Sequence, residues 1–220
     1  VRELEKSAAF SRQAIHDLGE ELLLPRERVP MPAILDVGVV VATCDRPAQL
    51  RSALESLAAQ TRKPEAVVVV NDGDDSVDDV VGEFARRLQI SVLRTPAPRS
   101  GSSVARNVAL DALDTALVAF LDDDNLMWPY WLETGAAMLE NDGSVDVIYG
   151  AQLGDRELST TDKSWFLVPY DFERHKKSNF IDLNQLMHRA SEVRFDTRMR
   201  RLVDWDYVLK LIDTVPGRTA

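Results

Sequence analysis

Hydrophobic and polar positions along the chain follow two alternating patterns. Residues 37–42 and 66–70 are short, almost uninterrupted apolar runs rich in valine. A polar loop follows each run, and apolar residues at helical spacing come next, at 50–60 and 77–88. Uninterrupted valine-rich runs are typical of strands buried on both faces, and the spaced residues indicate one face of a helix. The pattern therefore predicts two successive strand–helix units.

The same alternation of strands and helices continues through the middle of the chain. A strand is predicted at 90–95, and a loop of Pro, Gly and Ser leads to a helix over 104–112. A further buried strand covers 116–121, followed by a helix at 129–141 and a strand at 146–151. Strands that alternate with helices imply a mostly parallel sheet with helices on its faces and right-handed crossovers. The fold class is α/β and Rossmann-like.

The pattern is less regular at the two ends of the chain. Residues 1–24 have the spacing of an amphipathic helix, and prolines then mark a linker to about residue 35. We expect an N-terminal helical extension over 1–35 and one domain over 36–220 that is truncated at its C-terminal end. Residues 152–178 are polar and irregular, which predicts a functional or mobile loop.

Two further elements are predicted beyond this loop. Phe180 to His188 reads as a strand returning to the sheet, and Asp204 to Ile212 as a helix. Composition then limits the partners. With 36 acidic against 26 basic residues the net charge is −10, so nucleic acid is not an expected partner.

The single cysteine, Cys44, excludes an intramolecular disulfide and suits a reducing compartment. No apolar run approaches the roughly 18 residues that span a bilayer, and the N-terminus lacks the layout of a signal peptide. We expect a cytoplasmic protein, free or peripheral at the inner face of the membrane. Basic residues gather at 174–177 and 194–201. They form either a solvated face or a contact for an anionic ligand, such as a lipid pyrophosphate or acidic glycan.

Polar side chains follow three of the predicted strands where each strand ends. Asp45 follows the first, Asn71 and Asp72 the second, and the run 122–124 of three aspartates the fourth. In a parallel sheet these ends share one edge, where a nucleotide would fit. The chain has no Gly-x-Gly-x-x-Gly after the first strand and no phosphate-binding P-loop.

A divalent metal bridging carboxylates to a diphosphate would replace a glycine loop. Mg²⁺ commonly takes one or two carboxylates and completes its shell with phosphate oxygens and water. Asp122 and Asp124 are the candidate ligands for Mg²⁺ or Mn²⁺. The alternative is a solvated turn that caps the next helix, and Asp72 has the same alternative in an Asn-Asp-Gly turn.

These segments together resemble the family 2 glycosyltransferases of the GT-A fold. The resemblance covers residues 37–212, and its motifs are short but occur in the family's order. They are the loop Thr43 to Pro47, the segment Asn71 to Gly73, Gly101 with Ala105 to Asn107, the Asp-x-Asp segment Phe120 to Asp124, and Val203 to Asp206.

The resemblance implies transfer of a sugar from a nucleotide sugar, with a UDP-sugar favoured, to an acceptor hydroxyl, with inversion. A hydroxyl needs a base to remove its proton, and the match assigns this role to Asp204, with Asp206 as the second choice. By the same resemblance the nucleotide sugar is bound by a set of seven residues: Thr43, Asp45, Asp72, Gly101, Arg106, Asp122 and Asp123.

The acceptor is a glycan, a lipid-linked molecule or a small molecule, and a further domain or a homo-oligomer is compatible with the chain. Trp205 is expected near the acceptor or in the core. Three other functions stay open. A sugar nucleotidyltransferase should have a basic, glycine-rich first loop, and a phospho-acceptor receiver should have a lysine late in its sheet. A non-catalytic nucleotide-binding scaffold would explain why Asn71, Asn125 and Val203 depart from the family pattern.

Overall fold

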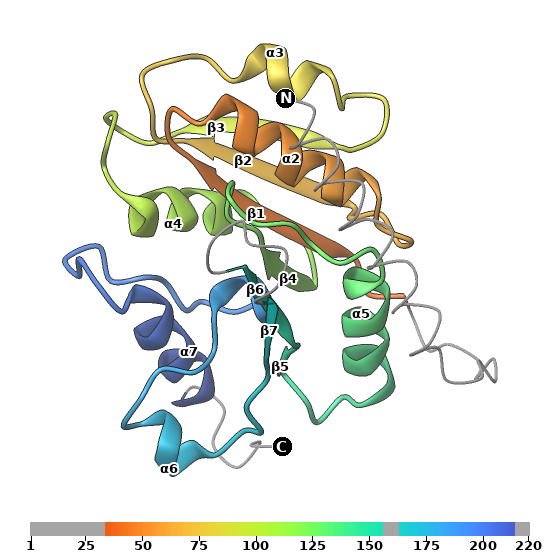
Figure 1. Ribbon diagram of the computed structural model, residues 1–220, viewed down its shortest axis with the longest axis vertical. Coiled ribbons are helices and arrows are strands. Elements are labelled where there is room, and N and C mark those ends of the chain that lie inside the picture. Colours follow the sequence, from red (N-terminus) through yellow and green to blue (C-terminus); the bar gives the residue numbers. More distant parts are fainter. Residues whose placement is uncertain (1–33, 156–162, 214–220) are drawn as a thin grey trace.

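The computed structural model describes residues 34–155 and 163–213, and the helix expected at 1–24 lies outside them. Its centre is a six-stranded sheet in the order β3-β2-β1-β4-β8-β5 (Figure 1). The first four of these strands are parallel, and β8 runs antiparallel to both β4 and β5. The sheet strands are β1 (Val37–Thr43), β2 (Ala66–Asn71), β3 (Ile90–Arg94), β4 (Leu117–Phe120), β5 (Val147–Tyr149) and β8 (Leu186–Arg189).

Helices cover both faces of this sheet. The described helices are α2 (Pro47–Ala58), α3 (Asp78–Gly82), α4 (Ser102–Ala112), α5 (Trp131–Asn141), α6 (Phe172–His175) and α7 (Val203–Asp213). Buried residues of α2, α3 and α5 share one hydrophobic cluster with the sheet, whereas those of α4 and α7 share the other. The α/β class and the mostly parallel sheet are thereby confirmed.

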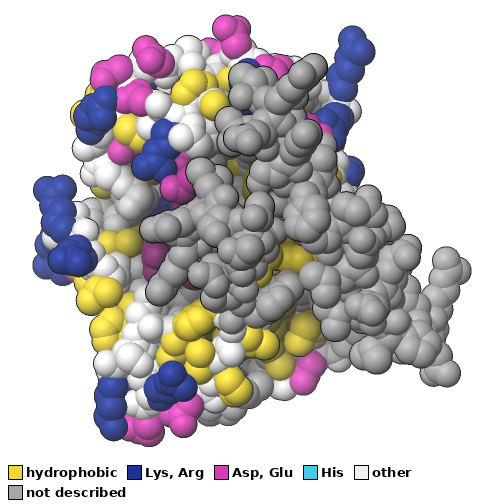
Figure 2. All heavy atoms as spheres, viewed as in Figure 1, with side chains coloured by type: hydrophobic (Ala, Val, Ile, Leu, Met, Phe, Trp, Pro, Cys, Tyr) yellow, Lys and Arg dark blue, Asp and Glu magenta, His cyan; other side chains and the backbone are white. Residues whose placement is uncertain are grey.

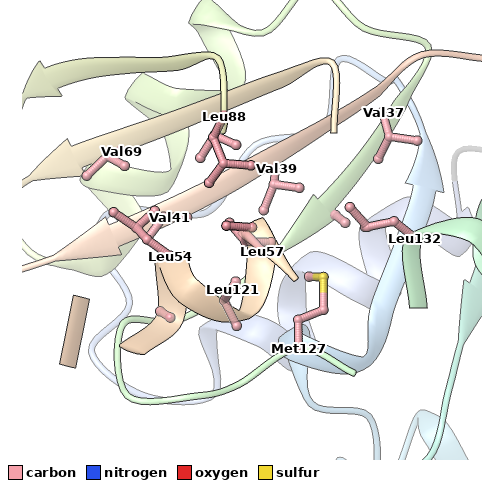
Figure 3. Packing of buried hydrophobic residues seen from close by; sticks show 14 of the residues in the cluster. Val37, Val39, Val41, Leu54, Leu57, Val69, Leu88, Leu121, Met127 and Leu132 are labelled. Carbon is pink, nitrogen blue, oxygen red and sulfur yellow. The ribbon is translucent and has the colours of Figure 1, made fainter. Parts of the chain in front are cut away.

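Alternation along β1 divides its side chains between these two layers. Val37, Val39 and Val41 pack with α2 and α5, and Val40 packs with α4. Figure 3 shows this first layer, with Leu54 and Leu57 of α2 against the valines. Fully burying such a side chain stabilises the fold by about 1.5–3 kcal/mol. The apolar run predicted from the sequence therefore forms a strand with two buried faces.

Three predicted elements need correction. The helix expected over 77–88 ends at Gly82, although Phe84 and Leu88 still pack in the core through turns. Residues 152–178, expected to be irregular, contain the hairpin β6 (Gln152–Asp155) and β7 (Lys163–Phe166) and the helix α6. The strand expected from Phe180 starts only at Leu186, because residues 183–185 form a 3₁₀ turn, η1, with a capping box on Asp182.

Within the described residues, no helix combines the length and the hydropathy required to cross a bilayer.

Candidate active site

The carboxyl ends of β1, β2 and β4 meet at one edge of the sheet, as the strand order requires. An open cleft of about 230 Å³ lies there. Its lining is made of small, hydroxyl and charged side chains: Ala42, Thr43, Cys44, Arg46, Asp72, Ser102, Ala105, Arg106, Asp122, Asp123 and Asp124. The structure thus brings together six residues of the predicted site, Thr43, Asp72, Arg106, Asp122, Asp123 and Asp124.

Two aspartates of the acidic run are linked to the loop after β1. The Thr43 hydroxyl donates to Asp123 Oδ2 over 2.7 Å, in a buried contact. Arg46 reaches both Asp123 Oδ1 at 3.2 Å and Asp124 Oδ2 at 3.0 Å. Asp123 is therefore a buried anchor between β1 and β4, whereas Asp124 is more than half exposed at the mouth of the cleft.

Asp122 lies in a different environment from its two neighbours. Arg106 donates to its Oδ1 over 2.7 Å, and the Asn184 amide donates to its Oδ2 over 3.1 Å. The backbone N–H of Asp122 in turn donates to Asn184 Oδ1 at 2.6 Å. The Asn184 side chain thus binds both the backbone and the carboxylate of Asp122, which fixes the orientation of this carboxylate.

Arg106 connects the cleft to α7. Its second guanidinium nitrogen donates to Asp204 Oδ1 over 3.0 Å, so one buried cation is shared by Asp122 and Asp204. The guanidinium also lies 5.4 Å from the centre of the Phe195 ring. Asp204 does not itself line the cleft formed by described residues, but it shares the Arg106 guanidinium group with Asp122, which does.

The aromatic support under Arg106 is rigid. Phe195 stacks on Tyr207 of α7, with ring centres 4.0 Å apart. The Asn107 side chain donates to the Phe195 carbonyl at 2.9 Å and accepts from its N–H at 2.8 Å. Two neighbouring residues of α4 therefore act together: Arg106 supplies the guanidinium group over the Phe195 ring, and Asn107 binds the Phe195 backbone.

Asp72 organises the loop that leads into α4. Its carboxylate accepts hydrogen bonds from the Thr95 hydroxyl at 2.7 Å and from the N–H groups of Ser100 and Gly101, both at 2.8 Å. Gly101 has φ +103°, a conformation that side-chain-bearing residues rarely adopt. Asp72 therefore lines the cleft and holds the loop that leads into α4. In the Asn-Asp-Gly turn that the sequence offered as its alternative role, the acceptor is instead Asn71 Oδ1, which binds the Gly73 N–H at 2.8 Å.

Besides Asp204, two residues of the predicted site do not line the cleft among the residues described. Asp45, at φ +55°, accepts from the Asp74 N–H at 3.0 Å and pairs with Arg99. Its carboxylate therefore fixes the loop after β2 rather than facing the cleft. Gly101 contributes only its backbone to the Asp72 turn, immediately before Ser102 at the cleft wall.

Burial and charge shift the pKa of two carboxyl groups in this region. Burial raises the pKa of Asp204, with Asp122 and Asp182 acting in the same direction and Arg106 opposing them. Burial also raises the pKa of Asp123, against the hydrogen bond from Thr43 and the charge of Arg46. Burial disfavours the cation of Arg106, but Asp122 and Asp204 outweigh it and raise the pKa of this guanidinium.

Sequence reasoning missed Asn184 and Arg46 as site residues. Asn184 belongs to the η1 turn, where Asp182 accepts its N–H at 2.9 Å and its side-chain amide at 2.8 Å. The only signal was the polar trio at positions 182, 184 and 185 inside an otherwise apolar segment. Arg46 lies in the loop quoted for the family resemblance, yet only its contacts identify it as a partner of the acidic run.

The Trp205 ring is half-buried and connected to α6. Its indole N–H donates to the His175 carbonyl over 2.7 Å. This contact holds the start of α7, and with it Asp204, against the α6 segment.

Comparison with known families agrees with this architecture. The family model described as "Glycosyl transferase family 2" matches residues 38–205. The chain therefore belongs to glycosyl transferase family 2, a family of sugar-transferring enzymes. A solved structure of Staphylococcus aureus TarS in complex with UDP superposes with a TM-score of 0.61 at 20% identity, over 80% of this chain and 54% of that one. This likeness shows the GT-A fold.

Curated relatives match at similar levels of identity. An uncharacterised glycosyltransferase of Methanocaldococcus jannaschii is 23% identical over 80% of this chain and 64% of its own length. A glycosyltransferase of Haemophilus influenzae is 32% identical over 50% of this chain and 42% of its own length. The chain thus spans less than two thirds of the length of these relatives.

Proposed function

We propose that this chain transfers a sugar from a nucleoside diphosphate sugar, with a UDP-sugar as the favoured donor, to an acceptor hydroxyl with inversion. Family membership and the UDP-bound TarS relative support this class of reaction. The observation that carries the proposal is the placement of Arg106 between Asp122 in the cleft and Asp204 on α7. In this proposal Asp122 serves the donor and Asp204 the acceptor, and the shared guanidinium group links the two carboxylates.

The donor is assigned to the cleft at the sheet edge. Thr43, Asp72 and Arg106, which all line the cleft, would contact the nucleoside and the diphosphate. Because Asp72 already accepts three hydrogen bonds, it would act mainly by shaping the loop at Ser100 and Gly101. An acceptor that is a glycan, a lipid-linked molecule or a small molecule would approach from the α7 side.

Asp122 and Asp124 would hold Mn²⁺ or Mg²⁺. Both line the same cleft and offer carboxylate oxygens, the donors that these ions prefer. No group of three or more His, Cys, Asp or Glu suited to a metal occurs among the described residues, so phosphate and water oxygens would complete the shell. When bound, the ion supplies charge neutralisation to the departing diphosphate.

Asp204 would act as the general base. It takes the proton of the acceptor hydroxyl while the hydroxyl oxygen bonds to the anomeric carbon, and the bond from that carbon to the diphosphate oxygen breaks. A carboxyl whose pKa is raised by burial is a stronger base than a solvated aspartate. Arg106 opposes this rise and favours the ionised form of Asp204, the form that a base requires.

The proposal is tested by thermal-shift titration of UDP-, GDP- and dTDP-sugars with and without Mn²⁺. Metal-dependent stabilisation by one nucleotide sugar is expected, because a ligand that binds the folded state raises the melting temperature. Asp204→Asn should keep this stabilisation and lose transfer to the acceptor. No stabilisation by any nucleotide, with or without metal, would contradict the donor site.

A further inference from the structure

Residues 196–202 form the loop between Phe195 and α7 and carry a concentration of exposed cations. Arg198, Arg200 and Arg201 are all exposed. Lys and Arg side chains stand out at the left edge of Figure 2, at the height of the loop that precedes α7 in Figure 1. This loop, the basic loop, is locally rich in positive charge, although the net charge of the whole chain is −10.

Two of these cations have no carboxylate partner in the part of the chain that the structure describes. Asp196 pairs with Arg198, Asp204 with Arg106 and Asp206 with Lys210, so the acidic groups nearest in sequence are already neutralised. Over residues 34–155 and 163–213, neither Arg200 nor Arg201 forms an ion pair. Most other arginines described do: Arg46, Arg51, Arg62, Arg87, Arg99, Arg106, Arg189, Arg194 and Arg198.

Hydrogen bonds hold the backbone at both ends of this loop. Asn107 holds Phe195 at one end, and the Asp206 N–H donates to the Leu202 carbonyl over 3.1 Å at the other. Leu202 adopts φ +60° with 55% of its surface exposed, a strained conformation for a leucine. Arg201 precedes Asp204 by three residues, so their Cα atoms lie within about 11 Å of each other.

Charge separates the two sides of the proposed site. The cleft is lined by four aspartates and only two arginines, whereas the loop that leads into α7 carries two exposed guanidinium groups with no ion pair among the described residues. Guanidinium groups bind phosphate oxygens through paired, charge-assisted hydrogen bonds. We propose that Arg200 and Arg201 form a subsite for a phosphate group of the acceptor. This subsite rests on the proposed function, in which Asp204 faces the acceptor.

The test measures binding of a soluble phosphodiester polymer, a glycerol phosphate oligomer, by isothermal titration calorimetry. The R200E/R201E variant should bind it about tenfold or more weakly than the unmodified chain, and R200K/R201K should retain part of the affinity. Arg86→Glu is the matched control. Arg86 is also exposed without a described ion-pair partner, but it follows α3, on the opposite face of the sheet from α7, and its reversal should change nothing.

Three results would overturn the subsite: no binding of the oligomer by the unmodified chain, equal binding by R200E/R201E, or an equal loss in Arg86→Glu. Vesicles separate the other source of phosphate. If phosphatidylglycerol vesicles bind through Arg200 and Arg201 and the soluble oligomer does not, the loop contacts a membrane surface and the proposal is wrong. UDP binding is measured in a separate titration. Because the oligomer titration contains no nucleotide, a failure to bind UDP counts against the donor site alone, and a failure to bind the oligomer counts against the phosphate subsite alone.

Discussion

Arg106 donates a hydrogen bond to Asp204 over 3.0 Å, and this contact joins α4 to α7 across 98 residues of sequence. The same guanidinium binds Asp122, so the cation belongs to both sides of the proposed reaction. Asp204 is otherwise surrounded by influences that favour its protonated form, namely burial, Asp122 and Asp182. The charge of Arg106 is therefore the main influence that lowers the pKa of Asp204 against these effects.

Arg106→Gln should move the acidic limb of the kcat/KM profile to higher pH. Removing the cation takes away the main influence that lowers the Asp204 pKa, so a larger fraction of the base is protonated at a given pH. We expect a loss of about 10–100-fold at neutral pH, the value of one charged hydrogen bond, with partial recovery at alkaline pH. Arg106→Lys keeps the charge and should shift the limb less. A uniform loss at every pH would instead indicate misfolding or lost donor contacts.

Asp204→Asn should lower kcat for transfer by about 10²–10⁴-fold, the usual contribution of a general base. Asparagine keeps the shape and can still contact Arg106, so nucleotide binding measured by thermal shift should be retained. Asp206→Asn is the matched control, because Asp206 is paired with Lys210 one turn along the helix. If Asp206→Asn abolishes transfer and Asp204→Asn does not, the assignment of the base is reversed.

Asp122→Asn and Asp124→Asn should each remove the Mn²⁺-dependent part of the nucleotide-induced thermal shift. Both substitutions replace an anionic ligand by a weaker neutral one, and treatment of the unmodified chain with EDTA should have the same effect. Glu83→Gln controls for the loss of one acidic charge, since Glu83 pairs with Arg51 outside the cleft. A nucleotide-induced shift that is unaffected by Mn²⁺ and by both substitutions would falsify the metal assignment.

The acidic end of β4 could be predicted from sequence because two simple rules locate it. An apolar run followed by aspartates marks the end of a buried strand, and parallel strands bring such ends to one edge. This reasoning grouped Asp45, Asp72 and Asp122, which lie far apart in the sequence, and of these Asp72 and Asp122 line the cleft whereas Asp45 does not. Thr43 was assigned to the site only by the family resemblance. The hydrophobic pattern also predicted the sheet and four of the helices that flank it.

The different partners of the three aspartates at 122–124 could not be predicted from the sequence. Asp122, Asp123 and Asp124 are adjacent, yet they bind Asn184, Thr43 and Arg46, respectively. These partners depend on how the η1 turn and the loop after β1 fold over the strand. Local periodicity also failed at 152–178, because short antiparallel strands and a single helical turn carry too few residues to show a period.

Asp72→Ala should destabilise the fold in addition to weakening nucleotide binding. The substitution leaves the buried Thr95 hydroxyl with one acceptor fewer and the N–H groups of Ser100 and Gly101 without their carboxylate. We expect the free energy of unfolding to fall by on the order of 3 kcal/mol, measured by urea denaturation. Asp45→Ala, which removes a more exposed carboxylate, should have a smaller effect. Equal losses in the two variants would contradict the central role of Asp72 in this loop.

His188 should make the stability of the chain depend on pH. It lies fully buried on β8, where its Nδ1 contacts the Arg189 carbonyl at 2.6 Å and its Nε2 the Tyr207 hydroxyl at 3.1 Å. Burial lowers the pKa of His188 to about 4, only partly offset by the backbone hydrogen bond. In the unfolded chain the pKa is about 6.5, so between these two values the unfolded state binds a proton that the folded state does not.

The contribution of neutral His188 to the free energy of unfolding is therefore fully present above about pH 6.5 and is lost progressively as the pH falls towards 4. At pH 5 the loss should be about 2 kcal/mol of unfolding free energy relative to pH 7.5. Urea denaturation of the unmodified chain and of His188→Gln at both pH values measures it. The variant lacks the titrating group while all carboxylates remain, so its stability should fall less on acidification. Identical acid losses in the two proteins would show that His188 carries its proton equally well when folded.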